Sequence, residues 1–315
     1  MELTIDIKDP VDVHAKLELG KLTLFIGPNL NGKSLLLQCI YNSAKGEKHN
    51  LTVDFTGAGE CSLNEEFDYV IYMDPYVITY YIYDKYRQYL DTEESEEKGR
   101  AFTGLSKLRD DVKAIHRLLD IRELSRDDDI FEGWSRVNNV VSEITEKLKQ
   151  ANREDEAKYL IPLKISMTRY GIEWKDVFGD EGSGVTNLTP SFYPSFVLTA
   201  TVYSYALSKK GKVLLILDEP DAFTYPSFAY TFGRIVRDLT ENSKSLYTIS
   251  VTHSWDFYKG IVSSGSLKGE KPSESNENIL NLKVFVVTRD GKRVDIKPKG
   301  KGWYIPGFSV SAILS

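Results

Sequence analysis

The sequence predicts an α/β fold, and three observations support this prediction. Short, mainly apolar segments typical of buried strands occur at 22–26, 213–217 and 246–251. A segment with helical character follows each of these strands along the chain. Near the C-terminus, two alternating segments flank Asp290-Gly291, a turn typical of β-hairpins. The pattern therefore indicates an α/β core with a hairpin at 282–298.

The remaining elements of the core are predicted from local patterns. Segments 2–7 and 13–19 alternate between apolar and polar residues like strands, and Asp9-Pro10 marks the turn between them. The run Tyr-Val-Ile-Tyr-Met at 69–73 is a further expected strand. Helices are expected at 33–44, 195–208, 226–241 and from Trp255.

Residues 84–151 differ from the rest of the chain because they are highly charged and lack strand alternation. Two sets of apolar residues keep helical spacing there, from Leu105 to Leu119 and from Ile130 to Leu148. Strand character returns from 162 to 189. We therefore expect a mainly helical subdomain to interrupt the α/β core.

Composition limits the classes of protein and partner. The chain has 315 residues and a net charge of −6, so a general electrostatic attraction to DNA or anionic lipid is not expected. The longest mostly apolar segment, Phe196 to Leu207, is too short to span a bilayer, and no membrane contact is expected. Nothing around Cys39 or Cys61 resembles a redox pair or a metal cluster, so two free thiols in a cytoplasmic protein are expected.

Residues 27–34 read GPNLNGKS and fit the phosphate-binding pattern G-x-x-x-x-G-K-[ST]. A predicted strand precedes the pattern and a predicted helix follows it, which is the context that the motif requires. Glycine lets successive backbone N–H groups turn toward a phosphate, and the N-terminus of the helix adds positive potential. Lys33 is expected at the β- and γ-phosphates, and Ser34 at Mg²⁺. The candidate nucleotide-binding residues of this loop are Gly27, Pro28, Asn29, Leu30, Asn31, Gly32, Lys33, Ser34 and Leu35.

A second motif, VLLILDEPD at 213–221, distinguishes between the classes of protein that carry such a loop. An apolar strand that ends in two acidic residues places one carboxylate beside a metal ion and the other beside an attacking water. Asp218 is therefore expected to bind Mg²⁺, and Glu219 to act as the general base. The pattern N-K-x-D, which specifies guanine, is absent from the sequence and this argues against a GTPase.

Together, GPNLNGKS and the strand that ends in Asp218-Glu219-Pro220-Asp221 resemble the ATP-binding-cassette (ABC) ATPases. Within them, the chain resembles the soluble branch that includes RecF-like, structural-maintenance-of-chromosomes-like (SMC-like) and OLD-like proteins. His253 follows the strand 246–251 at the position of the family's switch histidine. The resemblance implies that His253 contacts the γ-phosphate and holds Glu219 and the attacking water in register.

The resemblance also implies a domain organisation, namely an ABC-type P-loop NTPase fold with an inserted helical subdomain and a C-terminal β-hairpin. The ATPase core would comprise 1–75 and 186–262. The inserted, mainly helical subdomain would be 76–185, and 263–315 would form a C-terminal loop and hairpin extension. ATP and Mg²⁺ are the implied cofactors.

The sequence departs from the family pattern at three places. Tyr225 stands where the family has an Asp or His in a loop that crosses the dimer interface, and the other two departures concern candidate site residues. LTPSFYPSF at 188–196 stands where the family has a Ser-Gly-Gly signature that caps the γ-phosphate of a second subunit, and it contains no glycine. The stretch contains two serines, Ser191 and Ser195, and Ser195 is the better candidate for a phosphate contact. Asp74 stands where the family has a glutamine, and it is a candidate to contact Mg²⁺ through water.

The implied function is a fast or slow ATPase whose two subunits close on ATP and reset by hydrolysis. The resemblance suggests an ATP-dependent homodimer with a DNA or protein partner, and a role in DNA maintenance or mobile-element defence. A switch that binds ATP without hydrolysing it stays open as an alternative function, because the signature lacks glycine. A small-molecule kinase is a third candidate function.

A basic group lies on and just after the predicted hairpin. It is either a nucleic-acid contact or a solubilising face, and it comprises Lys292, Arg293, Lys297, Lys299 and Lys301, with Trp303 and Tyr304 adjacent.

Overall fold

A computed structural model of the chain describes residues 1–45, 59–73, 163–168, 171–176, 179–183, 209–222, 224–263 and 281–300, with separate helical positions within 135–150 and 199–207. The chain divides into two compact units. The first comprises Met1–Tyr72, Lys209–Asp221 and Ala229–Ser315, and the second comprises Met73–Ser208 and Ala222–Phe228. Three of the features singled out in the sequence belong to the first unit. They are the loop 27–34, here called the phosphate loop, the segment 213–221, and His253.

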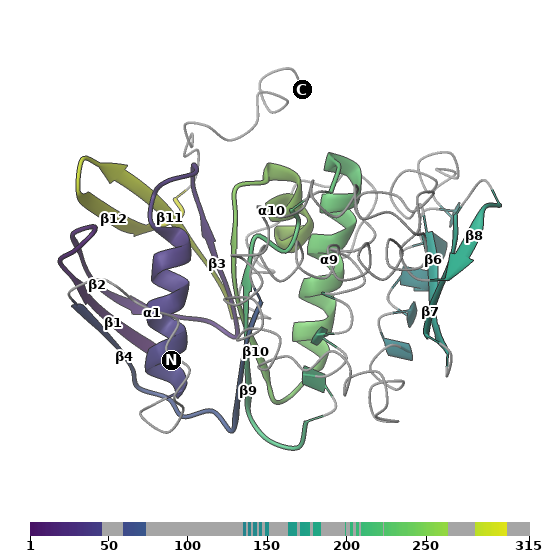
Figure 1. Cartoon of the computed structure of the whole chain (residues 1–315), viewed down its shortest axis with the longest axis horizontal. Helices are drawn as coiled ribbons and strands as arrows, with labels where there is room; N and C mark the ends of the chain where they lie inside the picture. The colour runs from purple at the N-terminus through teal and green to yellow at the C-terminus, as the bar shows by residue number, and fades with distance from the viewer. Residues whose placement is uncertain are drawn as a thin grey trace, which may run out of the picture. The chain divides into compact units, whose positions relative to one another are not determined.

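A six-stranded sheet forms the centre of the first unit (Figure 1). Its strands are β3 Leu22–Ile26, β5 Tyr69–Met73, β9 Val213–Asp218, β10 Leu246–Thr252, β11 Leu282–Asp290 and β12 Arg293–Pro298. The order in the sheet is β12-β11-β3-β10-β9-β5, with parallel pairing from β11 through β3 and β10 to β9. Every residue of β3 and β9 is buried, as expected for parallel strands that are covered on both faces. The predicted α/β class is confirmed.

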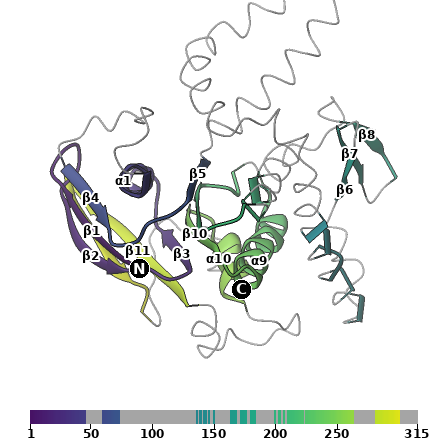
Figure 2. The same cartoon turned by 90° about the horizontal axis from the view of Figure 1, so that it is seen from below.

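Helices cover both faces of this sheet. α1 lies on one face, while α10 and the body of α9 lie on the other (Figures 1 and 2). α9 and α10 approach closely at Gly233 of α9 and Gly260 of α10. A Cβ atom on Gly233 would lie 2.3 Å from the carbonyl oxygen of Phe257, and one on Gly260 would lie 2.0 Å from that of Tyr230. The helices predicted in these regions are confirmed, with the bounds α1 Lys33–Lys45, α9 Pro226–Asn242 and α10 Trp255–Val262. None of the helices in the described part of the chain has both the length and the apolar character needed to span a bilayer.

The predicted C-terminal hairpin is confirmed, and its first strand extends the central sheet. β11 pairs antiparallel with β12 around Gly291, and it also pairs in parallel with β3 along Leu282 to Val286. Phe285 of β11 stacks on Phe25 of β3, with ring centroids 5.4 Å apart. The hairpin therefore lies directly beside the strand that leads into the phosphate loop.

A three-stranded antiparallel sheet with the order β2-β1-β4 completes the first unit. Its strands are β1 Glu2–Ile7, β2 Val13–Glu18 and β4 Gly59–Leu63. Buried and exposed residues alternate along β1, as the sequence predicts for a strand with one covered face. β4 was not predicted, because its sequence GECSL contains none of the β-branched or aromatic residues that favour strands.

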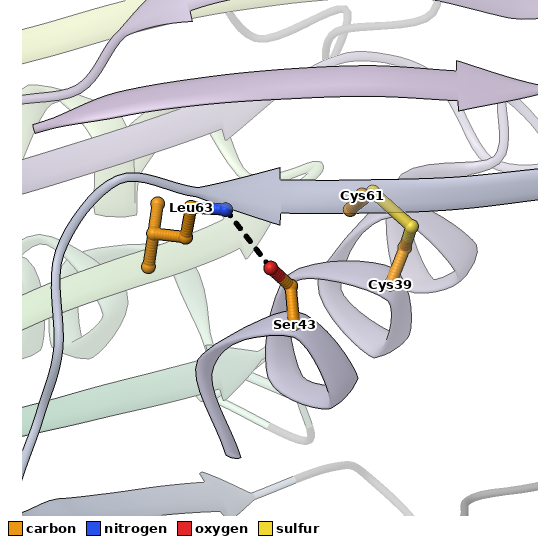
Figure 3. Close-up of a disulfide and its surroundings, with 4 residues drawn as sticks. All are labelled: Cys39, Ser43, Cys61 and Leu63. Carbon is orange, nitrogen blue, oxygen red and sulfur yellow. Dashed lines mark hydrogen bonds between the residues drawn. A yellow bond between two sulfur atoms is a disulfide. The ribbon is translucent and has the colours of Figure 1, made fainter. Parts of the chain in front are cut away.

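A disulfide joins α1 to β4. Cys39 lies on α1 and Cys61 on β4, with their Cα atoms 5.7 Å apart (Figure 3). Close to this bond, the backbone N–H of Leu63 donates a hydrogen bond of 2.9 Å to Oγ of Ser43, also on α1. The expectation of two free thiols is therefore wrong, because the fold brings the helix and the unpredicted strand together. Disulfides persist mainly in oxidising surroundings, and the cytoplasmic location stays a prediction.

The second unit contains a separate antiparallel sheet with the order β6-β7-β8. Its strands are β6 Leu163–Thr168, β7 Gly171–Asp176 and β8 Glu181–Ser183. They lie within the region 162–189, where strand character is predicted. The described positions within 135–150 are helical, in agreement with the second amphipathic run. The first run, from Leu105 to Leu119, lies outside the described residues.

Candidate functional site

The sequence motifs meet at the carboxyl ends of three adjacent parallel strands. β10 lies between β3 and β9 in the sheet. Ile26 of β3 pairs with Thr252 of β10, and Val251 of β10 pairs with Asp218 of β9. The strands therefore end in register, and the residues that follow them start at one edge of the sheet. Ligands of open α/β sheets bind at this edge.

The phosphate loop, residues 27–34, joins β3 to α1. Leu30 and Gly32 have φ angles of 67° and 78°, in the left-handed region that glycine adopts most readily. A leucine in this region carries a conformational cost of about 1–2 kcal/mol. The Leu30 side chain is 86% exposed, so packing of the side chain does not offset this cost. The loop keeps a sharp turn at a residue that is not glycine, which indicates that the neighbouring structure fixes its path.

The β11–β12 hairpin fixes part of that path. The side-chain amide of Asn31 donates a hydrogen bond of 3.0 Å to the carbonyl oxygen of Val287, and Nη1 of Arg289 donates one of 2.9 Å to the carbonyl oxygen of Leu30. Gly27 packs against the same strand, since a Cβ atom there would lie 2.3 Å from the Val287 carbonyl oxygen. Gly27 is therefore required by the contact with β11. Sequence reasoning gave Asn31 a role toward the nucleotide and did not find Arg289.

Lys33 lies inside the loop and is 4% exposed. Its Nζ atom donates a hydrogen bond of 2.8 Å to the carbonyl oxygen of Pro28. Burial lowers the pKa of Lys33, and the charges of Glu219 and Asp218 act in the opposite direction. The buried ammonium is therefore close enough to both carboxylates to interact with them, as the predicted site requires. Ser34 is exposed and Leu35 half-buried, both in the first turn of α1.

Asp218 ends β9 and is 2% exposed. The hydroxyl group of Tyr72 donates a hydrogen bond of 3.3 Å to its Oδ2 atom, and the Tyr72 ring packs on that of Tyr41 with centroids 5.4 Å apart. Tyr72 therefore holds the orientation of this carboxylate. The sequence indicates that Tyr72 belongs to a strand, but it contains no signal that this strand lies beside β9.

Glu219 and His253 form an ion pair, with 3.3 Å between Oε1 and Nδ1. The hydrogen bond from His253 lowers the pKa of Glu219 more than its burial raises it. The same hydrogen bond raises the pKa of His253. Glu219 has a φ angle of 49°, and its backbone N–H donates a hydrogen bond of 3.0 Å to the carbonyl oxygen of Val251. The two candidate catalytic residues therefore contact each other across the ends of β9 and β10.

The arrangement suits a magnesium nucleotide. Among the described residues, no group of three or more His, Cys, Asp or Glu side chains could hold a metal ion. Mg²⁺ usually keeps several waters and binds through one or two carboxylates together with substrate phosphates, so Asp218 and the Ser34 hydroxyl are a suitable protein contribution. The buried Lys33 ammonium matches the charge of a triphosphate. Asp74 and Ser195 lie outside the described residues.

The described basic residues of the hairpin contact groups of the protein itself. Nζ of Lys292 lies 3.6 Å from Asp9, and the side chains of Arg293 and Lys297 lie 3.2 and 3.9 Å from Asp295. Lys299 lies over the ring of Tyr258, 5.1 Å from its centroid. These contacts partly neutralise the basic group. Lys301, Trp303 and Tyr304 lie outside the described residues.

No protein-family model and no curated protein matches the sequence. Among solved structures, the chain is similar to the Smc head domain bound to the C-terminal domain of ScpA from Pyrococcus furiosus, with 12% identity, a TM-score of 0.48, and coverage of 95% of this chain and 96% of that chain. It is also similar to the SMC head domain from Thermotoga maritima, with 12% identity, a TM-score of 0.41, and coverage of 95% and 98%. A third similar structure is the ADP conformation of an ATP-binding cassette of an ABC transporter, with 13% identity, a TM-score of 0.39, and coverage of 95% and 92%.

These neighbours belong to the classes that the sequence motifs resemble, the SMC heads and the ATP-binding cassettes. At 12–13% identity the likeness concerns the fold alone. With TM-scores of 0.39–0.48, these likenesses carry no conclusion about what the chain binds or catalyses.

Proposed function

We propose that the chain binds ATP with Mg²⁺ and hydrolyses the ATP to ADP and phosphate. The observation that supports this most directly is the convergence of Lys33, Asp218, Glu219 and His253 at the ends of β3, β9 and β10. Lys33 binds the β- and γ-phosphates in this proposal, and Ser34 and Asp218 hold the metal. Bound Mg²⁺ would neutralise the charge that develops on the phosphates.

Glu219 is the proposed general base toward the attacking water. Its carboxylate is ionised at neutral pH because the hydrogen bond from His253 keeps its pKa low. The Glu219 side chain is 25% exposed and that of His253 is 45% exposed, so water and a phosphate can reach both. His253 is proposed to contact the γ-phosphate while it holds Glu219.

Replacement of Glu219 by glutamine tests this proposal. The variant E219Q keeps the shape of the side chain but removes the base, so the rate of phosphate release should fall by about 10²–10⁴-fold. ATP binding should persist, because Lys33 and the loop are unchanged. E60Q, on the exposed face of β4, is the matched control and should release phosphate at the wild-type rate. Equal phosphate release by E219Q and wild type would contradict hydrolysis at this site.

A switch that binds ATP without turnover is the second candidate, because the stretch at 188–196 has no glycine at the signature position. The two candidates differ in one result: a wild-type chain that binds ATP and releases no phosphate is a switch. A small-molecule kinase would transfer the phosphoryl group to an acceptor other than water.

Assembly and biological role are proposed from the resemblance of the motifs alone. We propose an ATP-dependent homodimer, which E219Q would trap in its ATP-bound form. A DNA or protein partner, a role in DNA maintenance or mobile-element defence, and a cytoplasmic location are proposed on the same basis.

A further inference from the structure

Two further side chains connect the turns that hold Glu219 and His253. The Oγ1 atom of Thr252 lies 3.0 Å from each carboxylate oxygen of Asp221, and the hydroxyl donates to this carboxylate. Thr252 is 0% exposed and Asp221 is 6% exposed. Water therefore competes little for the hydrogen bond, which strengthens it. Asp221 comes two residues after Glu219, and Thr252 immediately precedes His253.

The connection continues beyond His253. The backbone N–H of Ser254 donates a hydrogen bond of 2.9 Å to Oγ1 of Thr252. Ser254 also caps α10, since its Oγ atom accepts a hydrogen bond from the N–H of Phe257. An ionised carboxylate only accepts, so the Thr252 hydroxyl donates a hydrogen bond to Asp221 and accepts one from the Ser254 N–H. His253 therefore lies between two residues that hydrogen bonds fix in place.

Glu219 needs support of this kind because its backbone has a φ angle of 49°. A residue in a sparsely populated conformation persists only where the surrounding structure holds it. The N–H of Glu219 bonds to Val251 at 3.0 Å, and two residues later Asp221 bonds to Thr252. Both bonds join the end of β9 to the end of β10, where Glu219 and His253 come within 3.3 Å of each other.

We propose that Asp221 and Thr252 are positioning residues for ATP hydrolysis, which hold the Glu219 carboxylate and the His253 imidazole in register. This inference rests on the proposed ATPase function. The pair acts through Glu219 and His253, so its loss should lower kcat more than it weakens ATP binding, because the phosphate loop is a separate segment that would make most of the phosphate contacts.

Valine and serine at position 252 separate the hydroxyl from the shape of the side chain. T252V removes the hydrogen bond but keeps the branched shape, and kcat should fall by about tenfold to a hundredfold with little change in the Kd for ATP. T252S keeps the hydroxyl and should restore kcat to near the wild-type value. T248V is the matched control: Thr248 also lies on β10, is 0% exposed and hydrogen bonds to Thr240 at 2.8 Å.

Two readouts distinguish positioning from a loss of stability. If Thr252 acts through His253, the double variant T252V/H253A should have the kcat of H253A alone. The second readout is an NMR titration of His253, assigned among the four histidines by its loss in H253A. The bond to Glu219 raises the pKa of His253, and T252V should lower this pKa toward its ordinary value. The titration does not depend on turnover.

The outcomes separate this inference from the proposed function. If E219Q abolishes turnover while T252V and T248V have equal kcat and equal His253 titrations, the positioning role is overturned and the ATPase stands. If E219Q and wild type release phosphate equally, hydrolysis fails, and the His253 titration alone decides whether Thr252 positions the pair. Should T252V not fold, D221L replaces it, because leucine has a similar shape but no acceptor for the Thr252 hydroxyl. An unchanged kcat and titration in that variant would overturn the inference.

Discussion

Asp221 is a buried carboxyl group whose titration should be visible in the stability of the protein. Burial raises its pKa from 3.8 to about 6, although the hydrogen bond from Thr252 acts in the opposite direction. Between these two pH values the folded chain retains a proton that the unfolded chain has lost. The contribution of Asp221 to stability is therefore fully present below pH 4 and is lost as pH rises through about 6.

The variant D221N removes this titration and tests its sign. A shift from 3.8 to about 6 corresponds to about 3 kcal/mol of unfolding free energy between the two limits. Relative to D221N, the wild-type chain should lose about this amount as pH rises from 4 to 7. Urea denaturation of both chains across this range measures the difference. Stability curves that run parallel would show that the Asp221 carboxyl is not desolvated.

Individual residues were predictable from the sequence only where a motif contains them. Lys33, Asp218 and Glu219 follow apolar strands in patterns that specify phosphate and metal chemistry, and the structure brings them together. Tyr72 has no such pattern, since it contacts Asp218 across 146 positions of the chain. Asp221 belongs to the motif VLLILDEPD at 213–221, but the sequence does not identify its partner Thr252, because that contact depends on the pairing of β9 with β10.

α1 connects the phosphate loop to the N-terminal sheet through the bond between Cys39 and Cys61. The two cysteines are 22 positions apart, and closing a loop of this length is expected to stabilise the fold by about 3 kcal/mol. The double variant C39A/C61A should lose about this much unfolding free energy. Urea denaturation of the wild-type chain should show a similar loss on addition of dithiothreitol.

S43A is the matched variant for this junction, because it removes the neighbouring hydrogen bond to Leu63 and leaves the disulfide intact. S43A should lower the unfolding free energy by about 1 kcal/mol. Dithiothreitol should have no effect on C39A/C61A. A wild-type chain that is equally stable with and without the reductant would contradict the disulfide.

Strands and helices with strong periodicity were predictable, whereas the elements that depend on distant partners were not. β3, β9, β10 and α9 lie close to their predicted positions. β4 lacks strand-favouring residues and is a strand because it pairs with β1. The hairpin was predicted from its turn, but its parallel pairing with β3 depends on residues more than two hundred positions earlier in the chain, which local patterns do not specify.

The parallel direction of β3, β9 and β10 is what creates the site. An antiparallel β9 would place Asp218 and Glu219 at the opposite edge of the sheet from the phosphate loop. With the observed direction, the loop, the acidic pair and His253 start from one edge, and the buried Lys33 interacts with both carboxylates. The proposed activity depends on this meeting of segments that are about 185 positions apart in the chain.

Calorimetric titration of ATP in the presence of Mg²⁺ tests this arrangement most directly. The chain should bind ATP, and K33A should weaken binding by about tenfold to a hundredfold, because it removes a charge-assisted contact with the phosphates. K16A is the matched control, since Lys16 is an exposed residue of β2 paired with Glu2, and it should bind like the wild type. Equal ATP affinity in K33A and K16A would contradict a nucleotide site at Lys33.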